Sequence, residues 1–453
     1  MEYVGLLGSV ALLIYLALRG IDIVFAALLC AIIVILSNGL SLDRGLSEYF
    51  ALGPLGAFTF AGRFYLLFIA GAVFGRLMGD SHAASSLAMA LVRSLGAQRA
   101  LIITTLACAL LTYGGVVVFV VIFAIYPLGL RLLQESNIPK RLFCAAMALG
   151  SGTFTLTALP GTPSIHNVIS ARALGTDLFA APLLGFIGGA IMLGLGLIYL
   201  ERQRIKAAAA GEGFVPGPRD VILPADSAGP QLPPWPVALL PLILVITTIL
   251  LPRLLDGYAD EGAMARVLLF AQSQPVLWPS IALAFGSLVA VVLFPTLRRQ
   301  GLTTAGRGTH DAIMPLINTA AVIGFGGVVT QTAGFANFSS LVLDSGLPPL
   351  LSAFFSVSLV SGLTGSASGG LQIFMQTLAP AYLDLGIEPA VLHRIVTMAS
   401  GGVDSLPHCG AVVAMLTVTQ MTHREAYRDV GIITVVIPVI ATLLVIGLVA
   451  LGL

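Results

Sequence analysis

Four short segments combine glycine with serine or threonine inside otherwise apolar stretches of this 453-residue chain: residues 112–115, 150–163, 361–370 and 400–410. A helix that is interrupted exposes backbone N–H groups and a partial positive charge where the next helical piece begins. Several such helix starts directed at one point can bind a small anion without arginine or lysine, and hydroxyl groups add further donors. The chemistry that these segments favour is therefore reversible binding of a small carboxylate.

Within and next to these segments we predict the ligand-binding residues from their donor groups and backbone freedom. In the first half of the chain they are Gly114, Gly115, Ser151, Thr153, Thr155, Thr157, Gly161, Thr162, His166 and Asn167. In the second half they are Gly365, Ser366, Ser368, Ser405 and His408. Small polar residues are also common where membrane helices pack, and for an isolated serine or glycine packing is the better explanation. We favour a binding site here because the breaks are paired and contain Pro160, Pro163 and Pro407.

Two ionisable residues of the fourth segment are candidates for coupling to a cation, Asp404 and His408. Asp404 could carry a proton or a sodium ion, or its carboxylate could cap the helix after the break. His408 could exchange a proton near neutral pH or donate a hydrogen bond to a carboxylate. For His166 a fixed structural hydrogen bond is the alternative. Weaker candidates for lining the same cavity are Asn318, Gln331 and Thr332.

Membrane helices are the elements that must position these residues. Hydrophobic residues make up 57% of the chain and charged residues 9%, against about 25% charged in a typical soluble domain. This composition excludes an ordinary soluble enzyme, and the net charge of +1 excludes a nucleic-acid-binding protein. Apolar runs long enough to span a bilayer or close to it cover residues 3–18, 21–37, 57–79, 181–199, 236–252, 275–296, 310–333 and 430–452.

No catalytic residue, metal site or cofactor is expected. The sequence has no zinc-protease, phosphate-loop or nucleophile-elbow motif. The cysteines are scattered through apolar runs without metal-ligand spacing, so we expect them to be small buried hydrophobic residues: Cys30, Cys108, Cys144 and Cys409.

The two halves of the chain carry similar features in the same order, at an offset of about 250 residues. Pro127 corresponds to Pro380 and Pro139 to Pro389, and residues 147–152 resemble residues 398–402. A shared apolar composition is the alternative explanation, but several matches in one order favour an internal repeat.

The charges of equivalent loops predict that the two repeats have opposite orientations. Loops of the first half are basic and their counterparts in the second half are acidic. Because positive loops stay in the cytoplasm, equivalent loops should lie on opposite faces of the membrane. This path leaves most Lys and Arg residues inside and places outside only Arg44, Arg172, Arg253, Arg266 and Arg394.

We therefore predict an all-α polytopic membrane protein, an inverted-topology repeat with about ten transmembrane helices, two re-entrant hairpins and two broken helices. Residues 1–200 form the first repeat, with scaffold helices over 1–79 and a hairpin and broken helix over 100–172. Residues 201–235 form a cytoplasmic linker, extended and poorly ordered in its middle. Residues 236–453 form the second repeat, with a hairpin over 351–383 and a broken helix over 391–420. Both termini are expected outside, with no cleaved signal peptide.

Two motifs resemble the gluconate permease (GntP) family, and the similarity extends over nearly the whole chain. One is Ala-Leu-Pro-Gly-Thr-Pro-Ser-Ile-His-Asn at 158–167, which is most similar to members assigned to hydroxybutyrate-type acids. The other is Ser-Gly-Gly-Val-Asp-Ser-Leu-Pro-His-Cys-Gly-Ala-Val at 400–412, continuing through Thr-His-Arg-Glu-Ala-Tyr at 422–427. Cys409 departs from the asparagine or serine usual at its position.

The resemblance implies a bacterial inner-membrane symporter for small organic anions, such as gluconate or hydroxy acids, usually coupled to protons. It also implies membership of a larger ion transporter superfamily with inverted repeats, re-entrant hairpins, an elevator mechanism and frequent homodimers. From the residues and the resemblance together we expect a secondary active transporter of a small monocarboxylate, driven by a proton gradient or by sodium. Its partners would be the carboxylate, membrane lipids and a second copy, with no nucleic acid.

Two other functions are weighed against this one. A passive anion channel or uniporter would need a continuous polar path, whereas the breaks cluster at one region of each half. An intramembrane enzyme using Ser151 or Asp404 with a histidine would turn over its substrate without any gradient.

Overall fold

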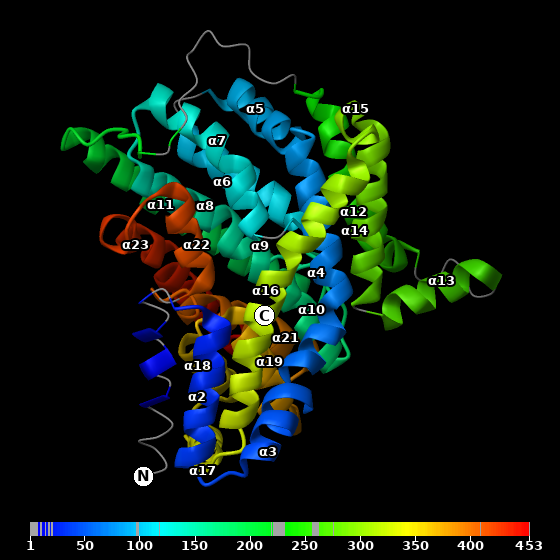
Figure 1. Cartoon of the computed structure of the whole chain (residues 1–453), viewed down its shortest axis with the longest axis vertical. Helices are drawn as coiled ribbons and strands as arrows, with labels where there is room; N and C mark the ends of the chain where they lie inside the picture. The colour runs from blue at the N-terminus through cyan, green and yellow to red at the C-terminus, as the bar shows by residue number, and fades with distance from the viewer. Residues whose placement is uncertain are drawn as a thin grey trace.

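The computed structural model describes residues 8–452, apart from residues 10, 14, 17–18, 20, 97–98, 117, 219, 221–231, 256–261, 275 and 408. Within these residues the secondary structure is helical, without any strand (Figure 1). Three predictions lie outside the described residues and stay predictions: His408 as a ligand, the positions of Met1 and Leu453, and the middle of the linker.

Five helical segments among the described residues are long and apolar enough to cross a bilayer, or six if one sharply bent pair counts as a single span. They are Leu42–Asp80, Pro182–Ala209, Trp235–Pro252, Gly301–Val329 and His423–Ala450. Other apolar runs form shorter helices, such as α2 (Ile23–Ser37) with 15 residues. At a rise of 1.5 Å per residue such a helix is shorter than the roughly 30 Å hydrocarbon core. Several apolar runs of the sequence are therefore not single helices of spanning length among the described residues.

A first group of helices, most of them long, packs as a bundle, which we call the long-helix group. It comprises α2, α4 (Ala57–Asp80), α12 (Trp235–Leu254), α14 (Leu277–Leu293) and α16 (Gly301–Val329). α4 and α16 pack along their length, α2 packs on α16, and α14 packs on both α4 and α12 (Figure 1). Glycine permits the close approach, since a Cβ on Gly308 would lie 2.7 Å from the backbone of Val73.

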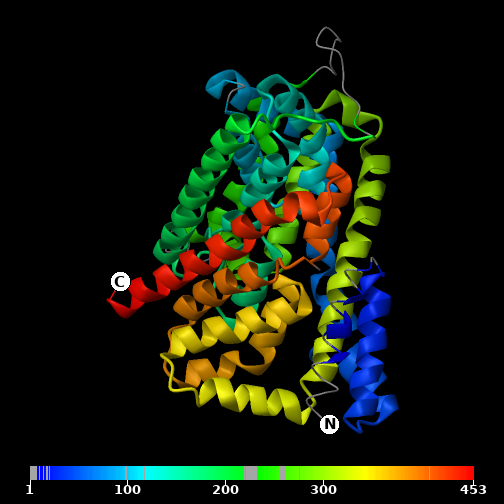
Figure 2. The ribbon, with the colours of Figure 1, turned by 90° about the vertical axis from the view of Figure 1, so that its left-hand side faces the viewer.

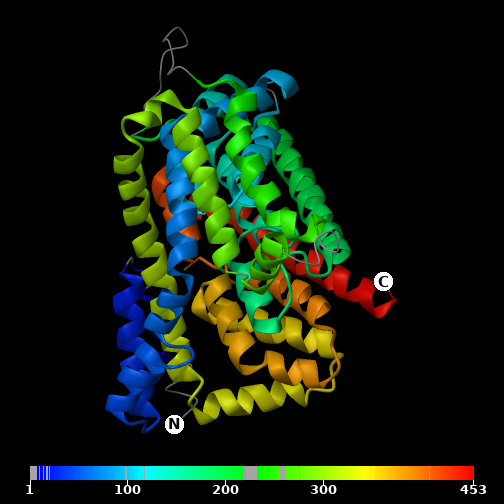
Figure 3. The ribbon, with the colours of Figure 1, turned by 90° about the vertical axis from the view of Figure 1, so that its right-hand side faces the viewer.

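The second group contains two helical hairpins and two interrupted helices, and we call it the broken-helix group. The hairpins are α6 (Ala100–Tyr113) with α7 (Val118–Ser136), and α18 (Pro349–Thr364) with α19 (Ala367–Thr377). The interrupted helices are α8 (Lys140–Gly152), α9 (Phe154–Thr157) and α10 (Ile165–Leu174), and α21 (Pro389–Val403) with α22 (Gly410–Thr419). In Figures 2 and 3, α6 and α7 occupy the upper half of the molecule and α18 and α19 the lower half.

Each interrupted helix ends against the hairpin of the other half of the chain. α10 packs on α19 and on α21, while α22 packs on α7. The elements also follow one another in the same order in both halves: a long helix, a short helix, a hairpin, an interrupted helix and a final apolar helix. In the first half these flanking helices are α4, α5 (Ala83–Leu95) and α11 (Pro182–Ala209), and in the second they are α16, α17 (Ala333–Leu343) and α24 (Ile437–Ala450).

The remaining elements are short connections: α3 (Leu42–Arg44), η1 (Gly45–Leu52), α13 (Gly262–Ser273), α15 (Pro295–Arg298), α20 (Ala379–Asp384), α23 (His423–Gly431) and η3 (Ile432–Val436). η1 and η3 are π-helical; η3 continues directly into α24, whereas a short turn beginning at Gly53 separates η1 from α4. The N-terminus of α23 is fixed by a capping box, in which Thr422 and Glu425 each satisfy a free N–H group.

Glycine and serine at the hairpin tips explain why the chain turns there. Gly115, at the first tip, has φ +94°, and a Cβ on it would lie 2.6 Å from the Leu283 side chain. Gly365, at the second tip, ends α18 in the left-handed conformation, and Ser366 then caps α19 by accepting from the N–H of Gly369 at 3.2 Å. Both turns bring a helix end to the middle of the molecule.

The linker begins later than predicted and is anchored before residue 221. α11 continues through Ala209. The side chain of Asp220 is fully buried, and its carboxylate accepts hydrogen bonds from Lys140 Nζ at 2.8 Å, Tyr126 Oη at 2.7 Å and Gln420 Nε2 at 2.8 Å. Burial acts to raise the pKa of Asp220, but the bonds from Lys140 and Tyr126 outweigh it and hold the pKa below its usual range. The start of the linker therefore ties α7 and α8 to the end of α22.

The charge pattern predicts that Arg394 lies in an outer loop, and this prediction is wrong. The residue lies on α21 with 0% exposure. Its guanidinium donates to the carbonyl oxygens of Ala158 at 3.0 Å, Ala180 at 2.8 Å and Leu178 at 3.4 Å. The sequence does not distinguish an arginine that donates to backbone carbonyl oxygens from one that is exposed to water, since either arginine can lie near the end of a helix.

Candidate substrate site

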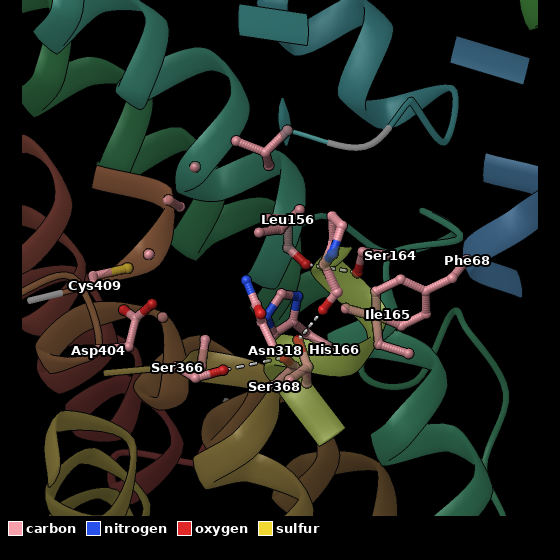
Figure 4. Close-up of a pocket in the computed structure, with 18 of the residues that line it drawn as sticks. Phe68, Leu156, Ser164, Ile165, His166, Asn318, Ser366, Ser368, Asp404 and Cys409 are labelled. Carbon is pink, nitrogen blue, oxygen red and sulfur yellow. Dashed lines mark hydrogen bonds between the residues drawn. The ribbon is translucent and has the colours of Figure 1, made fainter. Parts of the chain in front are cut away.

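A cavity of about 480 Å³ lies between the long-helix group and the broken-helix group. The long-helix group contributes α4 through Leu67, Phe68 and Gly71, α14 through Leu283, and α16 through Pro315, Asn318, Thr319 and Val322. The hairpin tips and the helix breaks supply most of the other walls. Figure 4 shows Asp404 and Cys409 on one side of this cavity and Phe68 and Ile165 on the other. The volume is in the usual range for a small-molecule site.

The N-termini of three half-helices open into this cavity. The first residues of α10, α19 and α22 all line it: Ile165 and His166, Ala367 and Ser368, and Gly410 and Ala411. Ser164 caps α10 and Ser366 caps α19, each through one side-chain oxygen. Cys409 occupies the N-cap of α22 but makes no capping hydrogen bond. Free N–H groups and the positive ends of these helices therefore face a common space.

Asp404 is the carboxylate of this cavity. It is 9% exposed and follows the end of α21. Ser405 Oγ donates to it at 3.1 Å, and the N–H of Ala367 at the start of α19 also faces it. Among the described residues no Lys, Arg or His pairs with it, and no Lys or Arg lines the cavity.

Asp404 is not the N-cap of the helix after its own break, since Cys409 occupies that position. Of the two roles considered for Asp404, capping of α22 is therefore wrong. The Asp404 carboxylate instead lies beside Ala367, the first residue of α19, which is the second helix of the second hairpin.

The structure brings together about half of the predicted ligand residues. The predicted residues that line the cavity are Gly115, Thr157, His166, Gly365, Ser366, Ser368 and Asp404. They come from both hairpin tips and both breaks, as the pairing of the four segments predicts. A Cβ on Gly401, at the kink of α21, would lie 2.5 Å from Thr157 Cγ2, so the two breaks touch each other.

Three of the predicted residues that do not line the cavity instead bond to the irregular backbone around it. Ser151, Thr153 and Thr155 each donate to a carbonyl oxygen of α8, at 2.7–2.8 Å. A chain break frees carbonyl groups, and the nearest hydroxyl groups are the obvious partners. The other predicted residues outside the lining are Gly114, Gly161, Thr162, Asn167 and Ser405.

Asn167 belongs to a buried polar network. It is 0% exposed, and its amide donates to the carbonyl oxygens of Thr162 at 2.9 Å and Leu178 at 2.8 Å. His393 Nε2 donates to its side-chain oxygen at 2.8 Å, and His393 Nδ1 bonds to Thr176 Oγ1 at 2.7 Å. This network joins α10 to α21 and so fixes the two interrupted helices to each other.

Several residues that line the cavity were absent from the predicted ligand set: Thr112, Ser164, Thr364 and Cys409. Thr112, Thr364 and Cys409 lie in the four polar segments and Ser164 follows one of them, but nothing in the sequence shows which hydroxyl groups bond to their own helix. Asn318 also lines the cavity, as an amide within an apolar run suggests, whereas Gln331 and Thr332 do not. The four cysteines are free and buried, which confirms their predicted hydrophobic role.

Comparison with known proteins decides the family. An uncharacterized transporter of Bacillus subtilis (strain 168), YxjC, is 37% identical, and the match covers 96% of each chain. The high-affinity gluconate transporter of Escherichia coli (strain K12) is 26% identical over 77% of this chain and 76% of its own length. The chain belongs to the gluconate permease family of transporters. No protein-family model matches it.

One further relative is also a transporter, and one solved structure shares the fold. An uncharacterized transporter of Haemophilus influenzae is 25% identical over 75% of this chain and 74% of its own. The crystal structure of the YdaH transporter of Alcanivorax borkumensis superposes with a TM-score of 0.54 at 14% identity, over 87% of this chain and 88% of that one. The latter similarity shows the fold alone. This family member is therefore an all-helical, multi-pass membrane transport protein and not an enzyme.

Proposed function

We propose that this family member is a symporter that takes up a small organic monocarboxylate, such as gluconate or a 3-hydroxybutyrate-like acid. A proton gradient drives it, with sodium as the alternative coupling ion. The observation that carries the proposal is a cavity in which three half-helix N-termini meet one buried carboxylate, Asp404. The gluconate transporter among its relatives supports an organic anion as substrate.

The substrate carboxylate binds to backbone N–H groups. A Lys or Arg side chain would bind the substrate carboxylate tightly. Each helix N-terminus instead contributes about 0.3–1 kcal/mol to the free energy of anion binding at an exposed site, and more at a buried one. Serine caps already satisfy one N–H group each on α10 and α19, so the uncapped start of α22 at Cys409 offers its first-turn donors to the ligand. Binding of this strength suits a substrate that must be released after each cycle.

Asp404 provides the coupling. Two carboxylates that share a buried cavity repel each other, and neither charge is compensated by Lys or Arg among the residues described. A proton on Asp404, or a sodium ion beside it, removes that repulsion and lets the anionic substrate bind. The cation and the substrate therefore favour each other's binding, and this reciprocity is the thermodynamic condition for symport. His408 remains a second candidate for the proton.

Transport follows from relative movement of the two groups of helices. The broken-helix group would carry the substrate in an elevator-type movement against the long-helix group, within a homodimer in the bacterial inner membrane. The repeated order of elements and the entry of the hairpins from opposite halves of the molecule (Figure 2) support an inverted repeat and hence two related end states. In the orientation that the basic loops predict, the Asp220 anchor and the linker are cytoplasmic and both termini are outside.

Uptake into proteoliposomes tests the proposal. Purified protein is reconstituted, and radiolabelled 3-hydroxybutyrate and gluconate are supplied with a proton gradient alone or a sodium gradient alone. We expect accumulation above equilibrium under one of these gradients, collapsed by the matching ionophore. Equilibration at the same rate with and without gradients would identify a uniporter or channel and would remove Asp404 from the mechanism.

A further inference from the structure

We propose that His393 and Asn167 are positioning residues, which hold the start of α10 in the place where it binds the substrate. The inference deepens the proposed function and rests on it, since it assumes that an organic anion binds at the helix N-termini of the cavity. Neither residue lines that cavity. Both act on the anion through the backbone of α10 and through the connections on each side of this helix.

The orientation of the Asn167 side chain is fixed by its neighbours. Its amide nitrogen lies 2.9 Å from the carbonyl oxygen of Thr162 and 2.8 Å from that of Leu178. Two acceptors require both N–H groups of the amide, so the amide oxygen faces away from them. That oxygen lies 2.8 Å from His393 Nε2. Because an amide oxygen can only accept, His393 Nε2 carries a hydrogen and donates it.

The second ring nitrogen of His393 is held as well. His393 Nδ1 lies 2.7 Å from the hydroxyl group of Thr176, which follows the end of α10. His393 and Asn167 are both 0% exposed, so no water competes for these bonds. The histidine of α21 therefore bridges the first turn of α10 and the connection after this helix.

The next residue of α21 holds the connections on both sides of α10. Arg394 donates to the carbonyl oxygen of Ala158, which precedes α10. It also donates to the carbonyl oxygens of Leu178 and Ala180, which follow α10. Leu178 thus accepts from both Arg394 and Asn167. The connection between α9 and α10 supplies part of the cavity wall, so these bonds fix that wall to α21.

α21 therefore links the substrate-binding helix to the proposed coupling carboxylate. Asp404 directly follows the last residue of α21, the helix that contains His393. A further bond between α10 and α21 joins the hydroxyl groups of Ser170 and Thr397 at 2.6 Å. Figure 4 shows Asp404 and His166, the second residue of α10, around the same cavity. Attachment of α10 to α21 thus restricts the distance between the carboxylate and the start of α10.

Loss of the bond between His393 and Asn167 would lower the affinity for the substrate. A buried amide oxygen without a partner is unfavourable, so the Asn167 side chain would reorient and release the carbonyl groups that it holds. The binding arrangement of α10 would then be one of several. If its population falls to about one tenth, the apparent Kd of the substrate rises about tenfold.

Two substitutions of His393 test the two ring nitrogens separately. In His393→Gln the side-chain amide reaches the position of Nε2 and can still donate to Asn167. In His393→Asn the shorter side chain reaches only the position of Nδ1, so Asn167 loses its partner. Equilibrium binding of 3-hydroxybutyrate and gluconate to the purified, detergent-solubilised transporter is measured by calorimetry. We expect affinity within about threefold of the unmodified protein for His393→Gln and about tenfold weaker for His393→Asn.

The matched control is Tyr382→Phe, in a different buried network. Tyr382 is 0% exposed, and its hydroxyl group bonds to the hydroxyl groups of Ser352 at 2.8 Å and Ser356 at 2.9 Å. It does not line the cavity. The control should lower the unfolding temperature without a change in ligand affinity. Weaker binding by His393→Asn at an unfolding temperature similar to that of the control then identifies positioning, since a general loss of stability would affect both variants alike.

Unchanged binding by His393→Asn would overturn the inference, as would equal weakening in His393→Asn and His393→Gln. If neither variant folds, hydrogen exchange of the unmodified protein decides. The amides of residues 168–171 should then exchange as slowly as those of residues 394–397, and fast exchange in α10 would overturn the inference. Binding of neither acid by the unmodified protein would instead overturn the proposed function, together with the inference that rests on it.

Discussion

Replacement of Asp404 by asparagine removes the proposed cation carrier while preserving its shape. The amide oxygen can still accept from Ser405 Oγ and from the N–H of Ala367, so the structural cost should not exceed about 1 kcal/mol. The change removes the ability to hold a proton or to neutralise a sodium ion. We therefore expect a folded protein that binds substrate and equilibrates it but does not accumulate it.

The expected size of the effect follows from the single carboxylate in the cavity. One proton per cycle and a gradient of one pH unit correspond to about 1.4 kcal/mol, or about tenfold accumulation of substrate for electroneutral symport. Without the carboxylate the accumulation ratio should fall to one. The apparent affinity for substrate should also lose its dependence on the coupling cation.

The assay is the steady-state ratio of radiolabelled 3-hydroxybutyrate inside and outside proteoliposomes under an imposed gradient. The matched control is Asp384→Asn, since Asp384 is an exposed carboxylate at the end of α20, outside the cavity. This control should accumulate substrate like the unmodified protein. Full accumulation by Asp404→Asn would refute the reasoning, because the cation would then be carried elsewhere.

Three further predictions concern the surrounding structure. Asp220→Asn should lower the unfolding temperature, because it leaves Lys140 buried and unpaired and reduces the free energy of unfolding by about 3 kcal/mol. The double variant Asp220→Asn/Lys140→Met should recover part of this free energy. The pKa of Asp220 is held below its usual range, so this stabilisation is complete above about pH 4 and is lost as the pH falls through the lowered pKa of the folded protein. The unfolding temperatures of the unmodified protein and of Asp220→Asn should therefore converge in acid. Gly150→Ala should destabilise by about 1–3 kcal/mol, since a Cβ there would lie 2.2 Å from the carbonyl oxygen of Thr105; unchanged melting would contradict the close packing of α6 on α8. Arg394→Lys should also lower the unfolding temperature, because one ammonium group cannot replace a planar guanidinium that donates to three carbonyl oxygens. Equal stability of the variant would show that these hydrogen bonds contribute little.

The membrane fold could be predicted from composition, and the elements of the site from their polar breaks. Apolar runs interrupted by glycine, serine and proline have few stable arrangements in a bilayer, because free backbone groups must be satisfied by protein or by a cavity. For this reason the residue pattern alone assigns the segments around Gly115, Thr157, Ser366 and Asp404 to one site, and all four of these residues line the cavity.

The individual ligand residues could not be separated from their neighbours. Ser151 and Thr157 lie in the same break and have the same chemistry, but only Thr157 lines the cavity. The difference is the direction in which each side chain leaves an irregular backbone, which has no repeating pattern in sequence. Asn167 and His166 differ in the same way, since adjacent residues on a helix face different sides.

The charge pattern predicts an orientation in the membrane, but it does not show which charged side chains are buried. Arg394 lies in the predicted second broken helix and Asp220 in the predicted linker, yet both side chains are buried and bonded to groups distant in sequence. The partners of Asp220 come from α7, α8 and the end of α22, so only the tertiary structure brings them together.

Cation movement that accompanies substrate uptake tests the central claim most directly. Proteoliposomes in weakly buffered medium, without any imposed gradient, receive 3-hydroxybutyrate while external pH and sodium are recorded with electrodes. We predict that substrate entry removes one kind of cation from the medium. Proton coupling would appear as alkalinisation and sodium coupling as a fall in external sodium, and Asp404→Asn should abolish either signal. Substrate entry with no movement of either cation would contradict this prediction.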